Sequence, residues 1–349
     1  MHGGNGPLSY VKNSSYQSAT LQFVQILNQQ RGVMEAAKAI IEEEISTKLE
    51  ISTNNSFHVA DFGCSTGNNS FPAMHTIIEA VIRKYESSDL KTPEFYVWFN
   101  DVVSNDFNTL FRSLPPDRSY KTGAVAGDFH GRLLPTSSVH FAYSSCSLHW
   151  LTEVPKAAEY LKSVWHGGEE REEAYVAYLS QFERDIESFL KCRAVEMVEG
   201  GIMALLIPGV PDSWDPLKEY TVGSVVEHIR SSLLDMAKKG RLSDAILETF
   251  NIPYHFATPK EIRDILEKSN SFNLERMDVL KNGTFLNVDG HVACFRAVHQ
   301  NMFAHMFGAE TVDETFDLLK KKLQSSPAFA NPLNDRTLFI VAILKHKHV

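Results

Sequence analysis

The sequence predicts an α/β fold, in which helices cover a layered β-sheet. Short apolar runs alternate with stretches of helical periodicity along most of the 349 residues. The first run, 57–62, ends at an acidic residue and a loop with two glycines, and the second run, 95–99, ends at Asn100-Asp101. Alternation of this kind is typical of sheets whose strands are connected through helices.

The first half of the chain reads as strand, helix, strand. After the run 57–62, apolar residues recur at three- and four-residue steps between Phe71 and Ile82, which predicts a helix lying on a sheet. The strand 95–99 follows, then a loop rich in Pro, Gly and Asp over 115–135, then a strand near 139–143. This order is typical of a mononucleotide-binding half.

The second half adds one more helix and strand before the pattern changes. A helical pattern over 174–198 ends at Gly200-Gly201, and the apolar strand 202–207 follows. Between Pro208 and Pro259 the strand signal vanishes and only helical periodicity remains, which predicts an inserted helical cap.

Capping-box sequences at 258–261 and 311–314 predict two further helix starts, and 337–344 is an apolar final strand. We therefore expect an N-terminal lid segment, an α/β core and a helical cap. The expected boundaries are 1–56 for the lid, 57–155, 174–210 and 270–349 for the core, and 156–173 and 211–269 for the cap.

Composition excludes several classes of protein. The chain is 43% hydrophobic and 22% charged, with a formal charge of −9, so binding to nucleic-acid phosphates is not expected. No stretch approaches the roughly 20 apolar residues of a membrane span, and the N-terminus lacks a signal pattern, so we expect a cytoplasmic protein with no membrane partner. The four cysteines form no CxxC pair, so neither a disulfide framework nor a zinc site is expected.

The loop from Asp61 to Gly67 indicates a nucleoside cofactor. A strand, a glycine turn and a helix N-terminus allow backbone to approach a ligand closely, and Asp101 at the next strand end can accept hydrogen bonds from two ribose hydroxyls. The loop alone is a weak signal, because any βα turn can carry two glycines. Its relaxed DxGxxxG pattern favours S-adenosylmethionine, which has no pyrophosphate to bind.

The segment 100–115, NDVVSNDFNTLFRSLP, resembles the NDxxxNDFNxLFxxLP signature of the plant SABATH methyltransferases, which methylate small carboxylic acids and xanthine-type nitrogens. The resemblance extends over nearly the whole chain, and it includes the segments 3–17, 60–67, 129–135, 144–151 and 250–253. It implies a Rossmann-like class I methyltransferase sheet with an inserted helical cap, S-adenosylmethionine as cofactor, a small carboxylic acid as substrate, and a homodimer.

The resemblance also implies which residues contact the cofactor. Asp101 would hold the ribose, Val102 and Phe129 would flank adenine, and Asp61 would support the methionine portion. Asp128 stands where the family has serine beside adenine, and a carboxylate there can accept from the adenine amine at a higher cost of burial. The cofactor residues implied are Tyr10, Asp61, Cys64, Asn69, Asp101, Val102, Asp128 and Phe129.

In the carboxyl-methylating branch of the family a glutamine and a tryptophan donate hydrogen bonds to the substrate carboxylate. The tryptophan is Trp150, whereas the glutamine is either Gln17 or Gln30, because the segment 18–30 intervenes before the ArgGly that usually follows directly. Neutral N–H donors hold a carboxylate without cancelling its charge. The implied substrate residues are Gln17, Gln30, Cys146, His149 and Trp150, with Cys146 in place of the usual tyrosine.

Some members of the family hold magnesium, and the corresponding positions here are His166, Glu248, Phe250 and Asn251. His166 stands where an asparagine is usual, and magnesium prefers oxygen ligands, so this position argues against the metal.

Methyl transfer from a sulfonium is an in-line displacement that depends on positioning two reactants in a dry pocket. A carboxylic acid is already ionised at neutral pH, so neither a nucleophilic side chain nor a general base is expected. Two alternatives stay open: N-methylation of a xanthine-like ring, and a catalytically impaired paralogue that only binds cofactor. The insert 18–30 and Asp128 motivate the second.

Overall fold

The computed structural model describes residues 21–155, 169–215, 218–243, 247, 251–281 and 286–348, with backbone alone at 21–34 and 169–172. Its centre is a seven-stranded sheet in the order β3-β2-β1-β4-β5-β7-β6, in which β7 runs antiparallel to both neighbours and the other pairs are parallel. The strands are β1 Ser56–Phe62, β2 Glu94–Asp101, β3 Tyr120–Ala126, β4 Val139–Ser145, β5 Met197–Gly209, β6 Phe272–Lys281 and β7 Leu338–His346.

Five of these strands confirm the predicted apolar runs, whereas β3 and β6 were not predicted. Both lie at the edges of the sheet, where one side of the strand faces solvent. β3 has the sequence YKTGAVA and falls inside the expected loop 115–135, and β6 alternates polar and apolar residues. Edge strands need less apolar sequence than central ones, so their signal is weaker.

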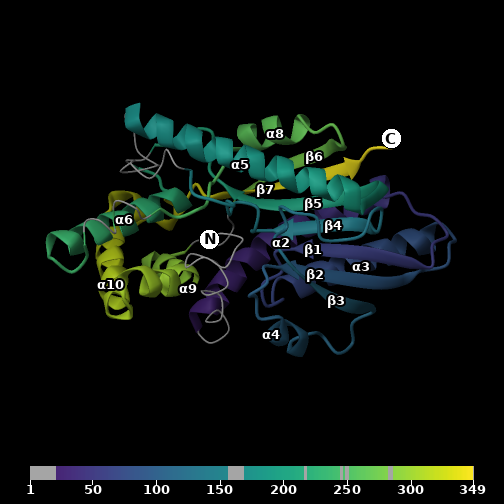
Figure 1. Ribbon diagram of the computed structural model, residues 1–349, viewed down its shortest axis with the longest axis horizontal. Helices are drawn as coiled ribbons and strands as arrows, with labels where there is room; N and C mark the ends of the chain where they lie inside the picture. Colours follow the sequence, from purple (N-terminus) through teal and green to yellow (C-terminus); the bar gives the residue numbers. More distant parts are fainter. Residues whose placement is uncertain are drawn as a thin grey trace.

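Helices cover both faces of the sheet (Figure 1). The helices α2 Leu21–Lys48 and α3 Ser70–Ser87 pack on one face, and α5 Glu169–Glu196 and α8 Pro259–Glu267 pack on the other. The predicted periodicity of α3 is confirmed, because its residues Phe71, Met74, Ile77, Ile78 and Val81 are buried. A short helix, α4 Phe107–Arg112, follows β2, and the side chain of Asp106 caps it by accepting from the Thr109 N–H.

The predicted end of α5 at Gly200 is wrong. The helix ends at Glu196, and β5 begins at once with Met197, so Gly200 and Gly201 lie within the strand. Gly200 has φ +74° and sits where the pairing of β4 with β5 shifts register between Val139 and Phe141. The glycines therefore form an irregularity in the strand and do not terminate the helix.

A second group of helices lies at one end of the molecule (Figure 1). The helices α6 Val222–Lys238, α9 Val288–Phe307 and α10 Ala309–Ser325 share a hydrophobic cluster that is separate from the two clusters under the sheet. The expected boundaries placed α9 and α10 in the core and α8 in the cap. In the structure α10 packs against both α6 and α9, and α8 packs beside β6.

The two capping-box predictions have different outcomes. The Thr258 hydroxyl accepts from the Glu261 N–H and the Glu261 carboxylate accepts from the Thr258 N–H, so the first box is confirmed. The second is wrong, because α10 begins at Ala309, directly after Gly308 at φ +91°. Inside that helix the Thr311 hydroxyl donates to backbone carbonyls, so the pattern ThrValAspGlu marks its first turn and not its cap.

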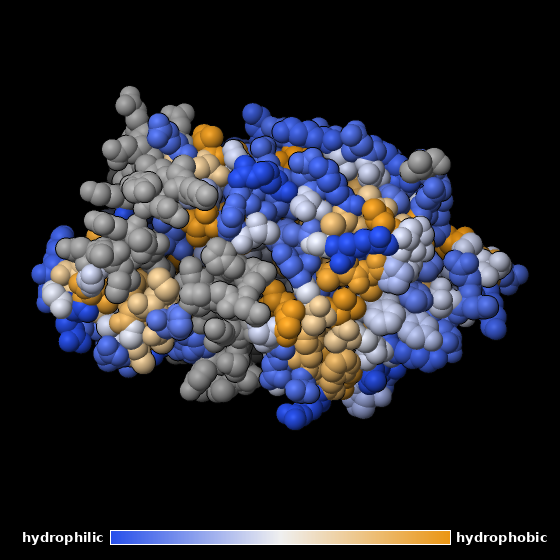
Figure 2. Space-filling view, in the orientation of Figure 1, coloured by the Kyte–Doolittle hydropathy of each residue, from blue (hydrophilic) through white to orange (hydrophobic). Residues whose placement is uncertain are grey.

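From Leu21 onward the inserted segment 18–30 is helical and forms the start of α2, which packs against α3 and α9. Across the described ranges, no helix is both long enough and apolar enough to cross a membrane. The face in Figure 2 agrees with this finding, since hydrophilic residues cover most of it and apolar ones occupy limited areas between them.

Candidate active site

The site lies where the strand order reverses, because the strands after β1 are added first on one side of it and then on the other. β1 pairs in parallel with β2 on one side and β4 on the other, so the carboxyl ends of all three strands meet at one edge. This is the topological switch point of an open α/β sheet, where ligands bind. A cavity of about 330 Å³ opens there and extends toward α6 and α9.

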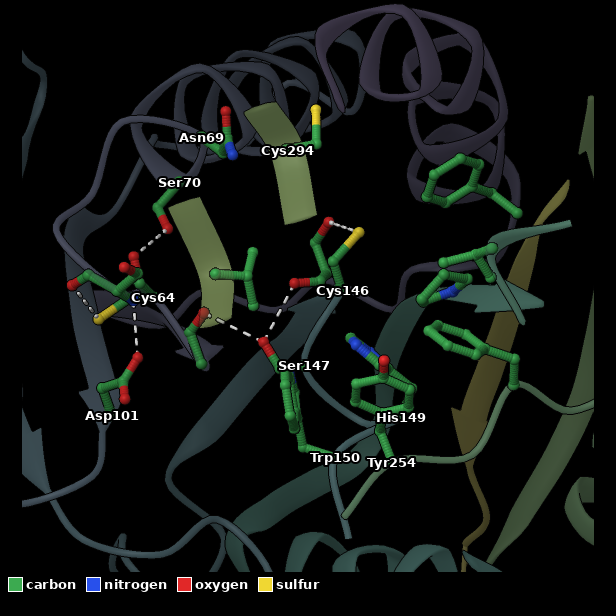
Figure 3. A pocket seen from close by; sticks show the side chains of 18 of the residues that line it. Cys64, Asn69, Ser70, Asp101, Cys146, Ser147, His149, Trp150, Tyr254 and Cys294 are labelled. Atoms are coloured by element: carbon green, nitrogen blue, oxygen red, sulfur yellow. Dashed lines mark hydrogen bonds between the residues drawn. The ribbon is translucent and has the colours of Figure 1, made fainter. Parts of the chain in front are cut away.

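The glycine loop after β1 is shaped by close approach of two segments. Gly63 has φ +87°, and a Cβ on it would lie 2.0 Å from the Ser147 hydroxyl oxygen, so no other residue fits. The Ser147 hydroxyl donates to the Gly63 carbonyl at 3.2 Å, and Figure 3 shows Ser147 between the two halves of the cavity. Gly67, at φ +93°, leaves room for the ring of Phe71.

Asp101 is held in one orientation at the end of β2. Its two carboxylate oxygens accept from the backbone N–H groups of Ser65, at 2.7 Å, and Val102, at 2.8 Å. The Asn105 side chain in turn donates to the Ser65 carbonyl at 2.7 Å. Burial raises the pKa of Asp101 to about 6, although both backbone bonds lower it. Each oxygen retains a lone pair for a further donor.

Asp61 lies at the end of β1, in the wall of the same cavity. Its burial raises the pKa to about 7, the negative charge of Asp101 adds to this, and a bond from Ser70 opposes it. Its Oδ2 has no hydrogen-bond partner among the described residues. An uncompensated carboxylate oxygen at a cavity wall is suited to a ligand that carries a positive charge or N–H donors.

Hydrogen bonds from the end of β2 hold the start of the loop that carries Asp128 and Phe129. The Asn100 side chain donates to the carbonyls of Val125 and Gly127, at 2.8 and 3.0 Å. Asp128 accepts from the His130 backbone N–H at 3.0 Å. Burial alone would raise the pKa of Asp128, but its bonds with His130 outweigh this and hold the pKa below its ordinary value.

A buried ion pair on α5 also fixes this loop. Arg193 and Glu196 have fully buried side chains, with Arg193 Nε 2.8 Å from Glu196 Oε2. The Arg193 guanidinium donates to the carbonyls of Phe129 and Gly131, and Glu196 accepts from the Leu134 N–H. The pair therefore determines where the backbone on either side of His130 lies.

The other half of the cavity begins at the turn after β4. Cys146 has φ +53°, and the chain then runs through His149 and Trp150. Trp150 pairs with Tyr254 in an antiparallel bridge, and their rings pack edge to face at 5.0 Å. Figure 3 shows Cys64 and Asp101 on one side of the cavity and His149, Trp150 and Tyr254 on the other.

The titratable groups in this half are neutral at physiological pH. Burial lowers the pKa of His149 to about 3 and raises that of Cys146 to about 11. Burial likewise raises the pKa of Cys64, well above its ordinary value. Neither thiol is therefore a thiolate nucleophile, and no imidazolium charge lies beside Trp150.

Ten predicted site residues line this one cavity: Asp61, Cys64, Asn69, Asp101, Val102, Asp128, Phe129, Cys146, His149 and Trp150. Tyr10, Gln17, His166, Glu248 and Phe250 lie outside the described residues, as does the side chain of Gln30. Asn251 is described but is not among the residues that line the cavity. Within the described ranges, no group of three acidic, histidine or cysteine side chains could hold a metal ion.

The sequence reasoning missed two kinds of residue. Residues of the first kind hold predicted site residues in place. They are Ser147 and Asn105, which lie within the motifs 144–151 and 100–115. The second lines the cavity from the helix α9 and the segment before α8: Tyr254, Phe256, Cys294, Phe295, Val298 and His299. Nothing local in the sequence marks this second group, because α9 and the segment before α8 are brought to the turn after β4 only by the tertiary packing.

Comparison with known proteins agrees with this arrangement. Residues 1–347 match the sequence profile of a family described as SAM dependent carboxyl methyltransferase. Loganic acid O-methyltransferase from Catharanthus roseus is 37% identical over 342 residues, which cover 93% of this chain and 88% of that protein. Farnesoic acid carboxyl-O-methyltransferase from Arabidopsis thaliana is 37% identical over 334 residues, covering 93% and 92%.

A solved structure, a loganic acid methyltransferase with SAH, has the same fold. It superposes with a TM-score of 0.85 at 35% identity, and the match covers 100% of this chain and 99% of that one.

Proposed function

The chain belongs to the family of S-adenosylmethionine-dependent carboxyl methyltransferases, the SABATH family, and we propose that it transfers the methyl group to the carboxylate of a small acid. The observation that carries this proposal is one cavity with two chemically different halves. Asp101 and the glycine loop line one half, and His149 and Trp150 line the other.

The first half fits S-adenosylmethionine. Asp101 would accept from the ribose hydroxyls, since its carboxylate is already oriented by Ser65 and Val102. Phe129 and Val102 would flank the adenine, and Asp61 would face the methionine portion, whose amine is a donor for the unpartnered Oδ2. We assign the remaining cofactor contacts to Tyr10, Cys64, Asn69 and Asp128.

When bound, the cofactor supplies an electrophilic methyl group on a sulfonium. The protein's own task is to hold the acid's oxygen in line with that group and to exclude water. The neutral state of His149 serves this purpose, because a cation beside the carboxylate would reduce its nucleophilicity. The protonated thiol of Cys146 does not compete with the acid for the methyl group.

We propose that Trp150 and one glutamine hold the substrate carboxylate through N–H donors. The glutamine is Gln17 or Gln30, and the two are distinguished by Gln17→Ala and Gln30→Ala, with Trp150→Phe alongside. The correct glutamine variant should raise KM for the acid about tenfold or more while KM for S-adenosylmethionine stays unchanged. The other glutamine variant is then the matched control. The clamp would be disproved if both glutamine variants left KM for the acid unchanged.

Family resemblance further suggests a homodimer, which light scattering of the purified chain would test directly. A cytoplasmic location stays a prediction from the sequence. We assign no step to magnesium. Of the four residues implied for it, Asn251 alone belongs to the part of the chain that the structure describes.

A further inference from the structure

Three polar side chains in the substrate half of the cavity have a hydrogen-bonding atom without a partner among the described residues. The atoms are His149 Nδ1, Tyr254 Oη and His299 Nε2. The three residues are 8%, 5% and 4% exposed, and all three line the cavity. Buried polar atoms in folded proteins nearly always have a partner, so three such atoms in one cavity wall indicate a ligand that supplies it.

The three side chains come from different parts of the chain and meet around Trp150. The Tyr254 ring lies 5.9 Å from the His299 ring and 6.2 Å from the His149 ring, measured between centroids. Trp150 lies 5.0 Å from Tyr254 and 6.3 Å from His299. His299 belongs to α9, whereas His149 and Trp150 belong to the turn after β4 and Tyr254 to the segment before α8.

The hydrogen-bonding role of His299 is fixed by its own helix. Its Nδ1 lies 2.8 Å from the Phe295 carbonyl oxygen, which can only accept, so Nδ1 carries the proton. Burial lowers the pKa of His299 to about 3, so the ring is neutral at physiological pH. Nε2 is therefore an unprotonated acceptor, and it requires a donor from whatever occupies the cavity.

The surroundings of these polar atoms are apolar. The Phe295 ring stacks on His299 at 4.0 Å, and the Phe256 ring stacks on His149 at 5.3 Å. Val298 and Leu286 complete this part of the wall. A ligand here has a mainly hydrocarbon body, and its polar group must lie within hydrogen-bonding distance of the unpartnered polar atoms.

We propose that His299 Nε2 and the Tyr254 hydroxyl form a subsite for a hydroxyl group on the acid. This hydroxyl is bonded to a carbon at some distance from the carboxylate. A hydroxyl donates one hydrogen bond and accepts others, so it can donate to His299 and accept from Tyr254. A hydrocarbon acid without this group leaves both atoms unpartnered and is discriminated against. The inference rests on the proposed function and narrows its substrate class to hydroxylated acids.

The test uses acids in pairs that differ by one hydroxyl. Suitable pairs are benzoate with para-hydroxybenzoate, cinnamate with para-hydroxycinnamate, cyclohexanecarboxylate with its para-hydroxy derivative, and decanoate with its terminal hydroxy derivative. For each pair kcat/KM is measured on the full chain with S-adenosylmethionine. We expect the hydroxylated member to be preferred in at least one pair by roughly tenfold to several hundredfold.

His299→Phe keeps an aromatic ring against Phe295 and removes the acceptor, so it should abolish the preference by lowering kcat/KM for the hydroxylated acid far more than for the plain acid. Tyr254→Phe, which removes only a hydroxyl, should reduce the preference and remains informative if His299→Phe does not fold. His305→Phe makes the same exchange on the exposed side of α9, outside the cavity, and should leave both activity and preference intact.

Binding of each acid to the protein loaded with S-adenosylhomocysteine, measured by calorimetry, separates this inference from the proposed function. A binding preference without ester formation would support the subsite and count against the transferase. The subsite is overturned if the wild-type chain shows no preference in any pair, or if His299→Phe and Tyr254→Phe weaken both members of a pair equally.

Discussion

Asp101 connects cofactor binding to pH. Its pKa of about 6 lies above the ordinary value of 3.8, so the carboxylate is ionised above pH 6 and protonated below it. Only the ionised form offers lone pairs on both oxygens to a ribose once Ser65 and Val102 have taken one each.

We therefore expect the affinity for S-adenosylhomocysteine to begin falling as pH drops through 7, where Asp61 takes up a proton, and to fall more steeply below 6, where Asp101 does so as well. Calorimetry between pH 5 and 8 measures it. Asp101→Asn should bind weakly at every pH and lose the steeper part of the slope below pH 6, while the part due to Asp61 near pH 7 stays. A variant that keeps wild-type affinity would show that the ribose lies elsewhere.

Asp61 lowers the stability of the protein without cofactor at neutral pH. Its folded-state pKa is raised to about 7, so the folded protein takes up a proton more readily than the unfolded chain. Stability linked to this group is fully present below pH 4 and is lost as pH rises through 7.

Replacing the buried charge by Asp61→Asn should therefore stabilise the cofactor-free protein at pH 8 by about 2–4 kcal/mol and give a clearly smaller gain at pH 5, where the folded protein still holds the proton. Thermal unfolding at the two pH values checks the prediction. A gain of equal size at both would mean that desolvation of the carboxylate is not the cause.

The position of residues in the cavity was predictable where sequence neighbours share a site. Asp61, Cys64 and Asn69 belong to one loop, and Asp101 with Val102 ends the next strand. The spacing of these motifs was therefore enough to predict that the five residues lie close together. His299 and Tyr254 were missed for the opposite reason. They come from α9 and from the segment before α8, and a sequence pattern does not specify that these two segments meet at Trp150.

At the scale of elements, the ion pair of α5 anchors the loop 127–134. Arg193 holds the Phe129 and Gly131 carbonyls, its guanidinium lies over the Phe62 ring at 4.2 Å, and Glu196 holds the Leu134 N–H. Removing one member of a buried pair leaves the other charge without a partner, which costs about 3–5 kcal/mol.

Arg193→Met should thus lower stability by that amount and raise KM for S-adenosylmethionine more than KM for the acid, because the loop carries Phe129. Lys191→Ala is the matched control, since Lys191 pairs with Glu187 on the exposed side of the same helix. It should cost less than about 1 kcal/mol. Equal losses in the two variants, measured by denaturant unfolding, would contradict the anchoring role.

Elements with strong periodicity were predicted, and those whose identity depends on position in the fold were not. The buried strands β1, β2 and β4 and the helix α3 carry apolar patterns that follow from burial on one or both faces. The edge strands β3 and β6 do not. α9 carries apolar residues around much of its surface, because it touches α2, α10 and the cavity at once, so no single face stands out in its sequence.

The whole molecule places two binding tasks on two separately packed parts. The cofactor half of the cavity is formed by strand ends of the sheet, whereas α9 and the segment before α8 supply much of the substrate half. On the proposed function, the acid would lie against both motif residues such as Trp150 and residues that no motif contains, such as His299. Substitutions in α9 should accordingly alter acid selectivity before they alter cofactor affinity.

Ester formation is the measurement that tests the central claim most directly. The purified full chain is incubated with trideuteromethyl S-adenosylmethionine and a panel of small carboxylic acids and xanthines, and the products are identified by mass spectrometry before and after mild alkaline hydrolysis. We expect the label on a carboxylic acid, its release by alkali as an ester requires, and its loss in Asp101→Ala. A label found only on xanthine nitrogens, or no transfer to any acid by a chain that binds the cofactor, would contradict the account.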